Sequence, residues 1–189
     1  MYAGDHARSN APAVKRALWR LLAFLLCFAL VNWGVMPLAL QAYAIPSGSM
    51  EGTILVGDRV YSERISYLFH DPEPGDIITF EDPHCPNSVL IKRVVATGGQ
   101  TIDLVDGQVV VDGTPLDEPY VNGKPTYPLD GWTALSYPYT IPEDELWVIG
   151  DNRTNSQDSR CFGSVPVDSV TGKAVFTYWP LPRIGLLES

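Results

Sequence analysis

The stretch "SVLIKRVVATGGQTIDLVDGQVVVDG", Ser88 to Gly113, shows the pattern that decides the fold of this chain of 189 residues. Its short runs are rich in Val, Ile and Thr, which favour strands. Asp106-Gly107 and Asp112-Gly113 flank "QVVV", and an Asp-Gly pair beside such a run is a strong hairpin signal. The stretch therefore predicts antiparallel strands joined by tight turns.

Runs of the same kind recur through the chain after residue 50: "DRVYSERISY", "GDIITFED", "ELWVIGD" and "GKAVFTYWP". No long amphipathic helical pattern separates them. We therefore expect residues 41–189 to form an all-β, mostly antiparallel domain, either a sandwich or barrel-like. The loop-rich segment "LDEPYVNGKPTYPLDGWTALSYPYTIPEDE" is expected to form a smaller β-rich excursion, over about residues 103–145.

A different kind of segment precedes the β-rich part. Residues 21–40, "LLAFLLCFALVNWGVMPLAL", carry no charge, and a helix of that length spans a hydrocarbon core of roughly 30 Å. The basic residues just before this run are Lys15, Arg16 and Arg20. The positive-inside rule then predicts a single-pass protein of the cell membrane: a cytoplasmic tail over residues 1–20, a transmembrane anchor over 21–40 and an extracytoplasmic domain over 41–189.

A cleavable signal peptide is the alternative interpretation of the N-terminal segment. Ala42-Tyr43-Ala44 has the small-x-small form of a cleavage site. The apolar run, however, is longer than the roughly 7–15 residues that are usual in secretory signals. We therefore prefer the anchor.

The charge of the predicted domain excludes one class of partner. The chain has a net charge of −9; residues 1–20 contribute +3 and residues 21–40 none, which leaves −12 on residues 41–189. Nucleic-acid binding calls for clustered Lys and Arg, so nucleic acid is not an expected partner. No closely spaced His/Cys cluster is present either, and we expect no metal and no cofactor.

Lysine is a better candidate than histidine for a general base that activates a serine. The histidines are His6, His70 and His84. The first precedes the predicted anchor, and the other two lie in proline-flanked loops that are typical of solvated turns. Lys92 instead lies inside the apolar run "SVLIKRVV", where alternation puts it on one face with Leu90 and Val94. Burial there would lower the pKa of its amine. The alternative is that Lys92 reaches water or pairs with a carboxylate.

The stretch "AIPSGSMEGTILVGDRV", residues 44–60, offers a candidate nucleophile. Gly48 lets the backbone turn sharply, so that Ser49 can project its hydroxyl. The Ser49 N–H and the Ser47 hydroxyl could then supply the two donors that the oxyanion of an acyl transfer needs. A plain loop is the alternative, since such triplets are common.

A dense polar segment, "GDNRTNSQDSRCFG" over residues 150–163, follows the apolar run "ELWVI". So many hydrogen-bonding groups directly after a buried strand need partners. Asp158 and Arg160 could lock this loop, and Ser156 could hold a neutral lysine amine. A solvated, charged loop is the alternative.

Together these stretches resemble bacterial type I signal peptidase, peptidase family S26. Members of this family are membrane-anchored Ser/Lys endopeptidases that remove signal peptides from exported proteins. "IPSGSM" with "TILVGDRV", "IKRVVATGGQ" and "GDNRTNSQDSR" match its boxes in order, and "PGDIITF" matches another recurrent element. The resemblance implies a mostly antiparallel β domain with a smaller β-rich excursion, which agrees with the strand pattern.

The same resemblance implies roles for individual residues. Ser49 would be the nucleophile, Lys92 the general base and Ser47 the oxyanion-hole donor beside the Ser49 N–H. The residues that would orient the lysine or hold the loops are Ser156, Asp151, Arg93, Asp158 and Arg160. The pockets for small substrate residues would be lined by Ile45, Met50, Ile54 and Ile91.

The chain departs from the family pattern at two turns. Gly52 stands where the serine box usually has a proline, and "ATGGQ", residues 96–100, replaces the usual "G-x-P-G-D". Both changes loosen turns without removing a catalytic group.

The partners implied by the resemblance are the signal peptides of exported preproteins and the lipid bilayer, and we expect a monomer. Two alternatives stay open. One is a Ser/Lys peptidase dedicated to a single substrate such as a conjugation pilin, and the other is a membrane-anchored β domain that binds peptides without cutting them.

Two further hypotheses concern modification of the chain. Cys85 and Cys161 lie in the predicted exported part, where an oxidising compartment would permit a disulfide if the 150–163 loop packs on the Lys92 strand. Two separate thiols are the alternative. Ala42-Tyr43-Ala44 is a possible self-cleavage site, cut in trans, because its small residues suit the presumed pockets.

Overall fold

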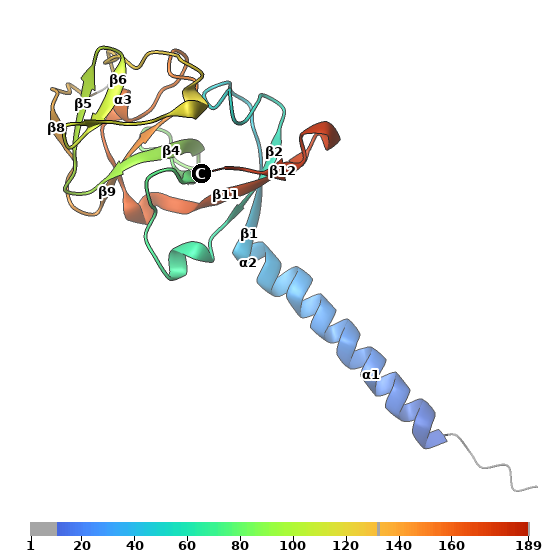
Figure 1. The fold of residues 1–189 in the computed structure, drawn as a ribbon. Coiled ribbons are helices and arrows are strands. Elements are labelled where there is room, and N and C mark those ends of the chain that lie inside the picture. The colour runs from blue at the N-terminus through green and yellow to red at the C-terminus, as the bar shows by residue number, and fades with distance from the viewer. Residues whose placement is uncertain (1–10, 132, 189) are drawn as a thin grey trace, which may run out of the picture. The chain divides into compact units, whose positions relative to one another are not determined.

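A computed structural model of the chain describes residues 11–131 and 133–188. The chain divides into two compact units, Met1–Ala39 and Leu40–Ser189. The described part of the first unit is helical, and the second consists of strands with short helical turns (Figure 1).

Residues 11–39 of the N-terminal unit form an uninterrupted run of helix. Helix α1 (Ala11–Ala29) continues through a π-helical stretch, η1 (Leu30–Val35), into α2 (Met36–Ala39). The window Lys15–Gly34 has a mean hydropathy of 1.7 and none of it is buried within the structure. Its length and composition allow it to cross a membrane, and its apolar window begins earlier than the predicted span of 21–40.

The larger sheet of the second unit contains eight strands, all paired antiparallel. Along the sheet their order is β1-β2-β11-β3-β4-β9-β10, and β12 pairs with β11. The strands are β1 (Leu40–Ala44), β2 (Arg59–Glu63), β3 (Ile77–Glu81), β4 (Val89–Thr97), β9 (Glu145–Ile149), β10 (Val165–Pro166), β11 (Val170–Trp179) and β12 (Gly185–Leu186).

The smaller sheet contains four strands in the order β7-β6-β5-β8. They are β5 (Thr101–Val105), β6 (Gln108–Val111), β7 (Thr114–Pro115) and β8 (Tyr139–Thr140). Its hairpin turns are Asp106-Gly107 and Asp112-Gly113, and all four of these residues have positive φ, from 51° to 80°. That is the backbone that a two-residue type I′ turn requires. The predicted antiparallel all-β fold with a smaller β-rich excursion is therefore confirmed.

Short helical turns connect the strands: η2 (Ser66–Leu68), η3 (Pro119–Val121), α3 (Ser159–Phe162), η4 (Val167–Ser169) and η5 (Leu181–Arg183). Asp158 caps α3, because its side chain accepts a hydrogen bond from the backbone N–H of Arg160. This cap fixes the end of the polar loop that follows β9.

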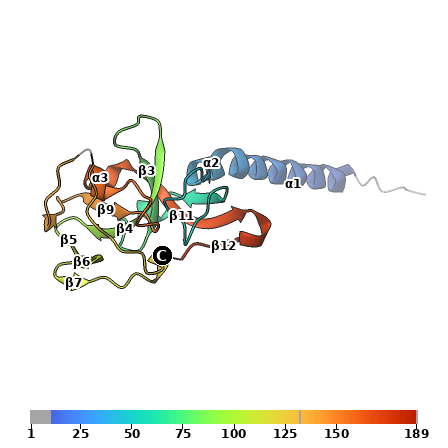
Figure 2. The ribbon, with the colours of Figure 1, turned by 90° about the horizontal axis from the view of Figure 1, so that it is seen from above.

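Apolar contacts hold the two sheets together. Val95, Trp147 and Ile149 of the larger sheet pack with Ile102 and Val109 of the smaller one, and all five are fully or almost fully buried. Figure 2 shows the smaller sheet beside β4 and β9. The smaller sheet is therefore fixed next to the strand that carries Lys92.

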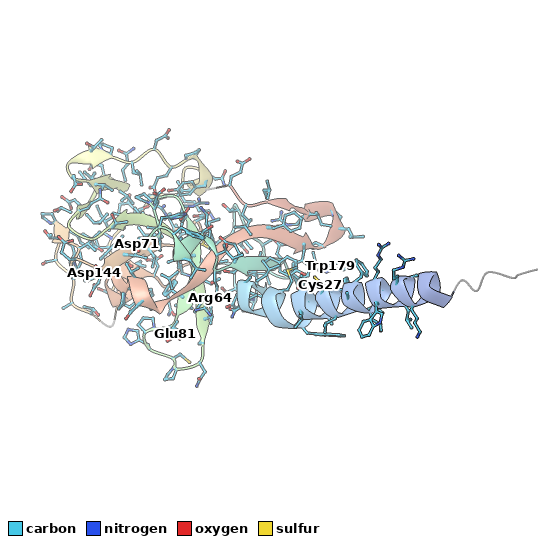
Figure 3. The ribbon with its side chains drawn as sticks, turned by 90° about the horizontal axis from the view of Figure 1, so that it is seen from below. Cys27, Arg64, Asp71, Glu81, Asp144 and Trp179 are labelled. Carbon is cyan, nitrogen blue, oxygen red and sulfur yellow. The ribbon has the colours of Figure 1, made fainter. Side chains whose placement is uncertain are left out.

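Some charged side chains lie on the surface of the same unit. Arg64, Glu81 and Asp144 are exposed, and Figure 3 shows them on the surface of the strand-rich unit. A separate apolar cluster lies beneath the turn that follows β1, where Ile54 and Val60 are fully buried. This cluster supports the turn that carries Ser49 from below.

Candidate active site

Ser49 lies in the turn that joins β1 to β2. The backbone N–H of Ile45 donates to the Asp58 carbonyl, and that of Gly57 donates to the Ile45 carbonyl, both at 2.9 Å, which closes the base of the turn. The side chain of Met50, next to Ser49, is fully buried and anchors the turn in the core. Ser49 itself is 8% exposed.

Lys92 lies in the middle of β4, opposite Ile78 of β3. Its amine lies 2.9 Å from the Ser49 hydroxyl oxygen and 2.9 Å from the Ile91 carbonyl oxygen. Within residues 11–131 and 133–188, no carboxylate forms an ion pair with it.

Burial sets the protonation of this lysine. Lys92 is 3% exposed, and desolvation lowers the pKa of its amine to about 8. The negative charges of Asp158, Asp82 and Asp151 act in the opposite direction, but more weakly. A neutral amine is therefore accessible near neutral pH, and it can accept a proton from Ser49.

Ser156 lies in the same groove as this pair but makes no hydrogen bond to Lys92. Its hydroxyl oxygen is buried and has no hydrogen-bond partner among the described residues. The lack of a side chain at Gly150 allows the loop after β9 to approach the serine turn closely. A Cβ there would lie 2.3 Å from the Ser156 hydroxyl oxygen and 2.4 Å from the Ser49 carbonyl oxygen. A side chain at Gly150 would push these two serines apart.

Two buried ion pairs connect the loops around the site. Arg93 binds Asp151 through Nε and one terminal nitrogen, each at 2.9 Å, and Thr53 donates to the same carboxylate at 2.5 Å. Arg160 binds Asp158 in the same two-bond way, also at 2.9 Å. The first pair connects β4 to the loop after β9 and to the serine turn, because Thr53 belongs to that turn.

The second pair closes the polar loop on itself. The backbone N–H of Gly150, at the start of the loop, donates to Asp158 at its end, at 3.1 Å. The competing interpretation of residues 150–163 as a solvated loop is wrong, because Asp151, Asp158 and Arg160 are each at most 1% exposed.

An open groove of about 610 Å³ runs past the pair. Its lining comes from the serine turn, from the first half of β4 and from the loop after β9, and includes Ile45, Ser47, Ser49, Ile91, Lys92 and Ser156. Leu129, from the long loop between η3 and β8 of the smaller sheet, also lines it, and no sequence pattern pointed to that residue.

The predicted pocket lining needs one correction. Ile45 and Ile91 line the groove, whereas Met50 and Ile54 do not. Both are fully buried, and they pack with Val60 beneath the serine turn. The Ile54 backbone N–H donates to the Met50 carbonyl at 2.8 Å, and the resulting turn carries both side chains into the core.

The structure also contradicts the hypothesis of a disulfide. Cys85 and Cys161 are both free thiols. Cys161 points into the core cluster that contains Phe80 and Phe162, while Cys85 is exposed in the loop between β3 and β4. The loops come near each other, but α3 turns Cys161 inward.

The possible self-cleavage site lies in regular sheet. Ala42-Tyr43-Ala44 belongs to β1, and Tyr43 pairs with Val60 of β2. An extended substrate cannot enter a groove while its backbone is paired in this way, so a cut here would first require β1 to separate from β2.

Sequence reasoning missed the contacts of the segment 118–124. Lys124 lies in the polar stretch "NGKPT", and its amine lies 2.7 Å from the Asn152 side-chain oxygen. Glu118 binds Arg153, and the Tyr120 ring lies 4.0 Å from the Arg93 guanidinium. The only signal was the cluster of polar and aromatic residues in "EPYVNGK", which points to no particular partner.

This arrangement permits hydrolysis through a serine. A hydroxyl in contact with an amine of lowered pKa can be deprotonated and can attack a carbonyl group. The groove leaves room for a polypeptide beside the hydroxyl. The geometry therefore fits the class of serine hydrolases that use lysine as the base.

Comparison with known proteins identifies the family. The family model for signal peptidase, peptidase S26, matches residues 17–179. A probable signal peptidase I-2 of Synechocystis is 37% identical over 82% of this chain and 70% of that protein. Signal peptidase I of Leptolyngbya laminosa is 39% identical, covering 82% and 76%, and that of Mycobacterium tuberculosis is 34% identical, covering 97% and 80%. The chain therefore belongs to the signal peptidase family, peptidase S26, as the sequence predicted.

Membership assigns a general activity. The chain is a hydrolase of the protease class that takes part in signal-peptide processing. Its N-terminal apolar helix is compatible with membrane anchoring.

Proposed function

We propose that this chain is a membrane-anchored endopeptidase that removes N-terminal signal peptides from exported preproteins with a Ser49/Lys92 dyad. The single observation that carries this proposal is the distance of 2.9 Å between the Lys92 amine and the Ser49 hydroxyl in a buried site. The burial that lowers the pKa of Lys92 makes the amine a usable base.

The reaction would proceed in two halves. The neutral Lys92 amine accepts the Ser49 proton while the hydroxyl oxygen attacks the scissile carbonyl carbon. The Ser49 N–H and the exposed Ser47 hydroxyl donate to the resulting oxyanion. The Lys92 ammonium then protonates the leaving amine, the peptide C–N bond breaks, and an acyl-enzyme remains. In the second half Lys92 removes a proton from water while the water oxygen attacks the ester carbonyl carbon. The ester C–O bond then breaks, the acyl part leaves as a carboxylic acid, and Lys92 returns the proton to the Ser49 oxygen.

The surrounding residues would hold this geometry. The Ser156 hydroxyl is buried and has no hydrogen-bond partner in the part of the chain that the structure describes, so it is available to accept a hydrogen bond from the Lys92 ammonium once Ser49 has lost its proton. The Arg93–Asp151 and Asp158–Arg160 pairs would keep β4, the serine turn and the polar loop in register.

The groove would bind the end of the signal peptide in an extended form. Ile45 and Ile91 both line the groove next to the dyad, and they would contact small apolar side chains. We propose that these two residues shape the pockets next to the cut.

The membrane topology follows from charge and from chain length. Lys15, Arg16 and Arg20 favour a cytoplasmic N-terminus, which sends the β domain to the outer side. Nine residues lead from Leu40 to Ser49, at most about 30 Å of extended chain. The nucleophile would therefore stay near the membrane, where a signal peptide presents its cleavage site.

A cleavage assay with several unrelated preproteins tests this function. The full chain in detergent should release one mature protein from each preprotein, and folded Ser49→Ala should release none. Ser169→Ala, in η4 and not among the residues that line the groove, is the matched control and should cleave normally. Binding without cleavage would favour the peptide-binding alternative, and cleavage of a pilin precursor alone would favour the dedicated peptidase.

A further inference from the structure

The segment 118–124, which follows β7 and contains η3, lies outside the family motifs, yet it contacts three of the site's supports. Glu118 makes a two-bond ion pair with Arg153, with oxygens at 2.8 and 2.5 Å, and the Tyr120 ring lies against Arg93. Lys124 binds Asn152 at 2.7 Å. The smaller sheet therefore reaches the catalytic loops through this segment.

Asn152 is the support closest to the nucleophile. Its side-chain nitrogen donates to the Gly48 carbonyl at 2.8 Å and to a Glu51 carboxylate oxygen at 3.1 Å. Its backbone N–H donates to the Ser49 carbonyl at 3.0 Å. Asn152 is 3% exposed, so these bonds form with almost no competition from water. One buried residue thus binds the turn on both sides of Ser49.

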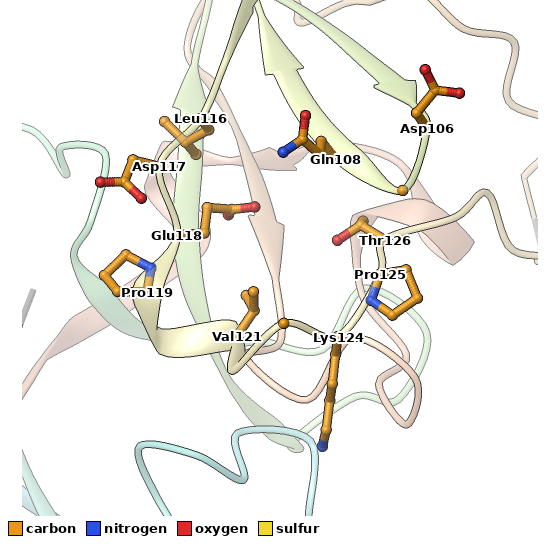
Figure 4. A pocket seen from close by; sticks show the side chains of 12 residues that line it. Asp106, Gln108, Leu116, Asp117, Glu118, Pro119, Val121, Lys124, Pro125 and Thr126 are labelled. Atoms are coloured by element: carbon orange, nitrogen blue, oxygen red, sulfur yellow. The ribbon is translucent and has the colours of Figure 1, made fainter.

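Lys124 reinforces the orientation of the Asn152 amide that the Gly48 and Glu51 acceptors also favour. An ammonium can only donate hydrogen bonds, so it requires the amide oxygen. The amide nitrogen must then face Gly48 and Glu51, where both neighbouring groups are acceptors. A flipped amide would set its oxygen against two acceptors and its nitrogen against a cation. Figure 4 shows the Lys124 side chain extending away from the pocket that Glu118 and Thr126 line.

We propose that Lys124 is a positioning residue for the nucleophile. It fixes the Asn152 amide, and the amide fixes the Gly48 carbonyl and with it the Ser47-Gly48-Ser49 turn. The catalytic part of this inference rests on the proposed function, whereas the structural part does not. The contact of its amine with the Asn152 side-chain oxygen gives Lys124 this role.

Three variants test the proposal in the full chain. Lys124→Met keeps the length and apolar stem of the side chain but loses the hydrogen-bond donor. Lys124→Arg keeps a charged donor, because the guanidinium stays protonated. Lys173→Met is the matched control, because Lys173 pairs with Asp76 and lies outside the groove. Lys124→Met should lower kcat about 10-fold with KM changed less than about 2-fold, since a slightly displaced nucleophile slows chemistry more than binding. Lys124→Arg should recover most of kcat.

A second readout does not require cleavage. The Glu51 backbone N–H donates to the Gly48 carbonyl at 3.1 Å, so its hydrogen exchange reports the order of the turn. Exchange over residues 47–52 should be faster in Lys124→Met than in wild type, and unchanged in Lys173→Met. The pH at which the rate rises should not move, because Lys124 is not among the charges that shift the pKa of Lys92.

The outcomes separate the inference from the function. Unchanged exchange over residues 47–52 in Lys124→Met would overturn the proposal, whether or not the wild type cleaves preproteins. Faster exchange with full kcat in a cleaving enzyme would overturn its catalytic part. A wild type that cleaves nothing would count against the proposed function alone, and the exchange data would still decide the role of Lys124.

Discussion

Strands β4 and β11 flank β3, and Lys92 of β4 and Lys173 of β11 are both paired with Ile78 of β3. The surroundings of the two lysines nevertheless differ. Lys173, on β11, forms an ion pair with Asp76 at 2.5 Å, and its side chain is 26% exposed. Lys92, on β4, is 3% exposed, and among the described residues its amine hydrogen-bonds to the uncharged oxygens of Ser49 and Ile91. The same position in a sheet can thus hold a paired surface lysine or a buried amine.

The difference lies in how each site compensates for desolvation. A carboxylate in contact stabilises a charged ammonium, whereas a hydroxyl and a carbonyl compensate only in part for the loss of water. Burial therefore lowers the pKa of Lys92 from 10.5 to about 8. The absence of a close carboxylate is what distinguishes the candidate base from its neighbour.

The largest expected effect is on cleavage by Lys92→Arg. An arginine stays protonated and cannot take the Ser49 proton. Its rate should fall by roughly 10⁴-fold or more, as when a nucleophile or base is removed from other serine proteases. The wild-type rate should rise with pH through about 8 as Lys92 loses its proton. Initial rates between pH 6 and 10 measure both effects.

Lys173→Arg serves as the control for that substitution. It keeps the ion pair with Asp76 and should show the wild-type rate and pH profile. A folded Lys92→Arg protein with a normal rate would show that Lys92 is not the base.

A smaller effect is expected on the free energy of unfolding, because replacing Lys92 should abolish cleavage but stabilise the fold. Below pH 8 the folded protein buries an ammonium, and the lowered pKa corresponds to about 3 kcal/mol of destabilisation. Lys92→Met should therefore be more stable than wild type at pH 7 by up to about 3 kcal/mol, although inactive.

The pH dependence of that gap tests its cause. Between pH 8 and 10.5 the unfolded chain binds a proton that the folded chain does not, so wild-type stability rises with pH. The advantage of Lys92→Met should shrink over this range and vanish above it. Urea unfolding at pH 7 and pH 10 measures the gap, and equal gaps at both values would contradict a desolvated ammonium.

The comparison also shows what could be predicted from sequence. Lys92 was found because it interrupts an apolar run, and the fold because strand-forming runs alternate with Asp-Gly turns. These signals are local, so one segment suffices to detect them. The prediction that Met50 and Ile54 line the pocket was wrong. Apolar residues beside a nucleophile are compatible with a pocket or with a core, and only the folded turn decides between the two.

Contacts between residues far apart in the sequence also could not be predicted. The bond between Lys124 and Asn152 joins residues 28 positions apart and depends on how the smaller sheet packs on the larger one. The inward turn of Cys161 depends on α3, a helix of four residues with almost no periodic signal. Neither is encoded in a local pattern of residue types.

The smallest expected effect concerns Lys173→Met. This substitution removes the ion pair but leaves Asp76 two donors, the Tyr67 hydroxyl at 3.0 Å and the Glu73 backbone N–H at 3.3 Å. Because the lysine side chain is 26% exposed, solvent screens the pair, and the loss in unfolding free energy should be about 1 kcal/mol. Cleavage should stay at the wild-type rate. The double-mutant cycle with Asp76→Asn isolates the pair energy, since any effect of either residue alone cancels. Loss of cleavage in a folded Lys173→Met protein would mean that the lysines on both sides of Ile78 serve catalysis, and that the partner of a lysine does not separate structural from catalytic roles in this sheet.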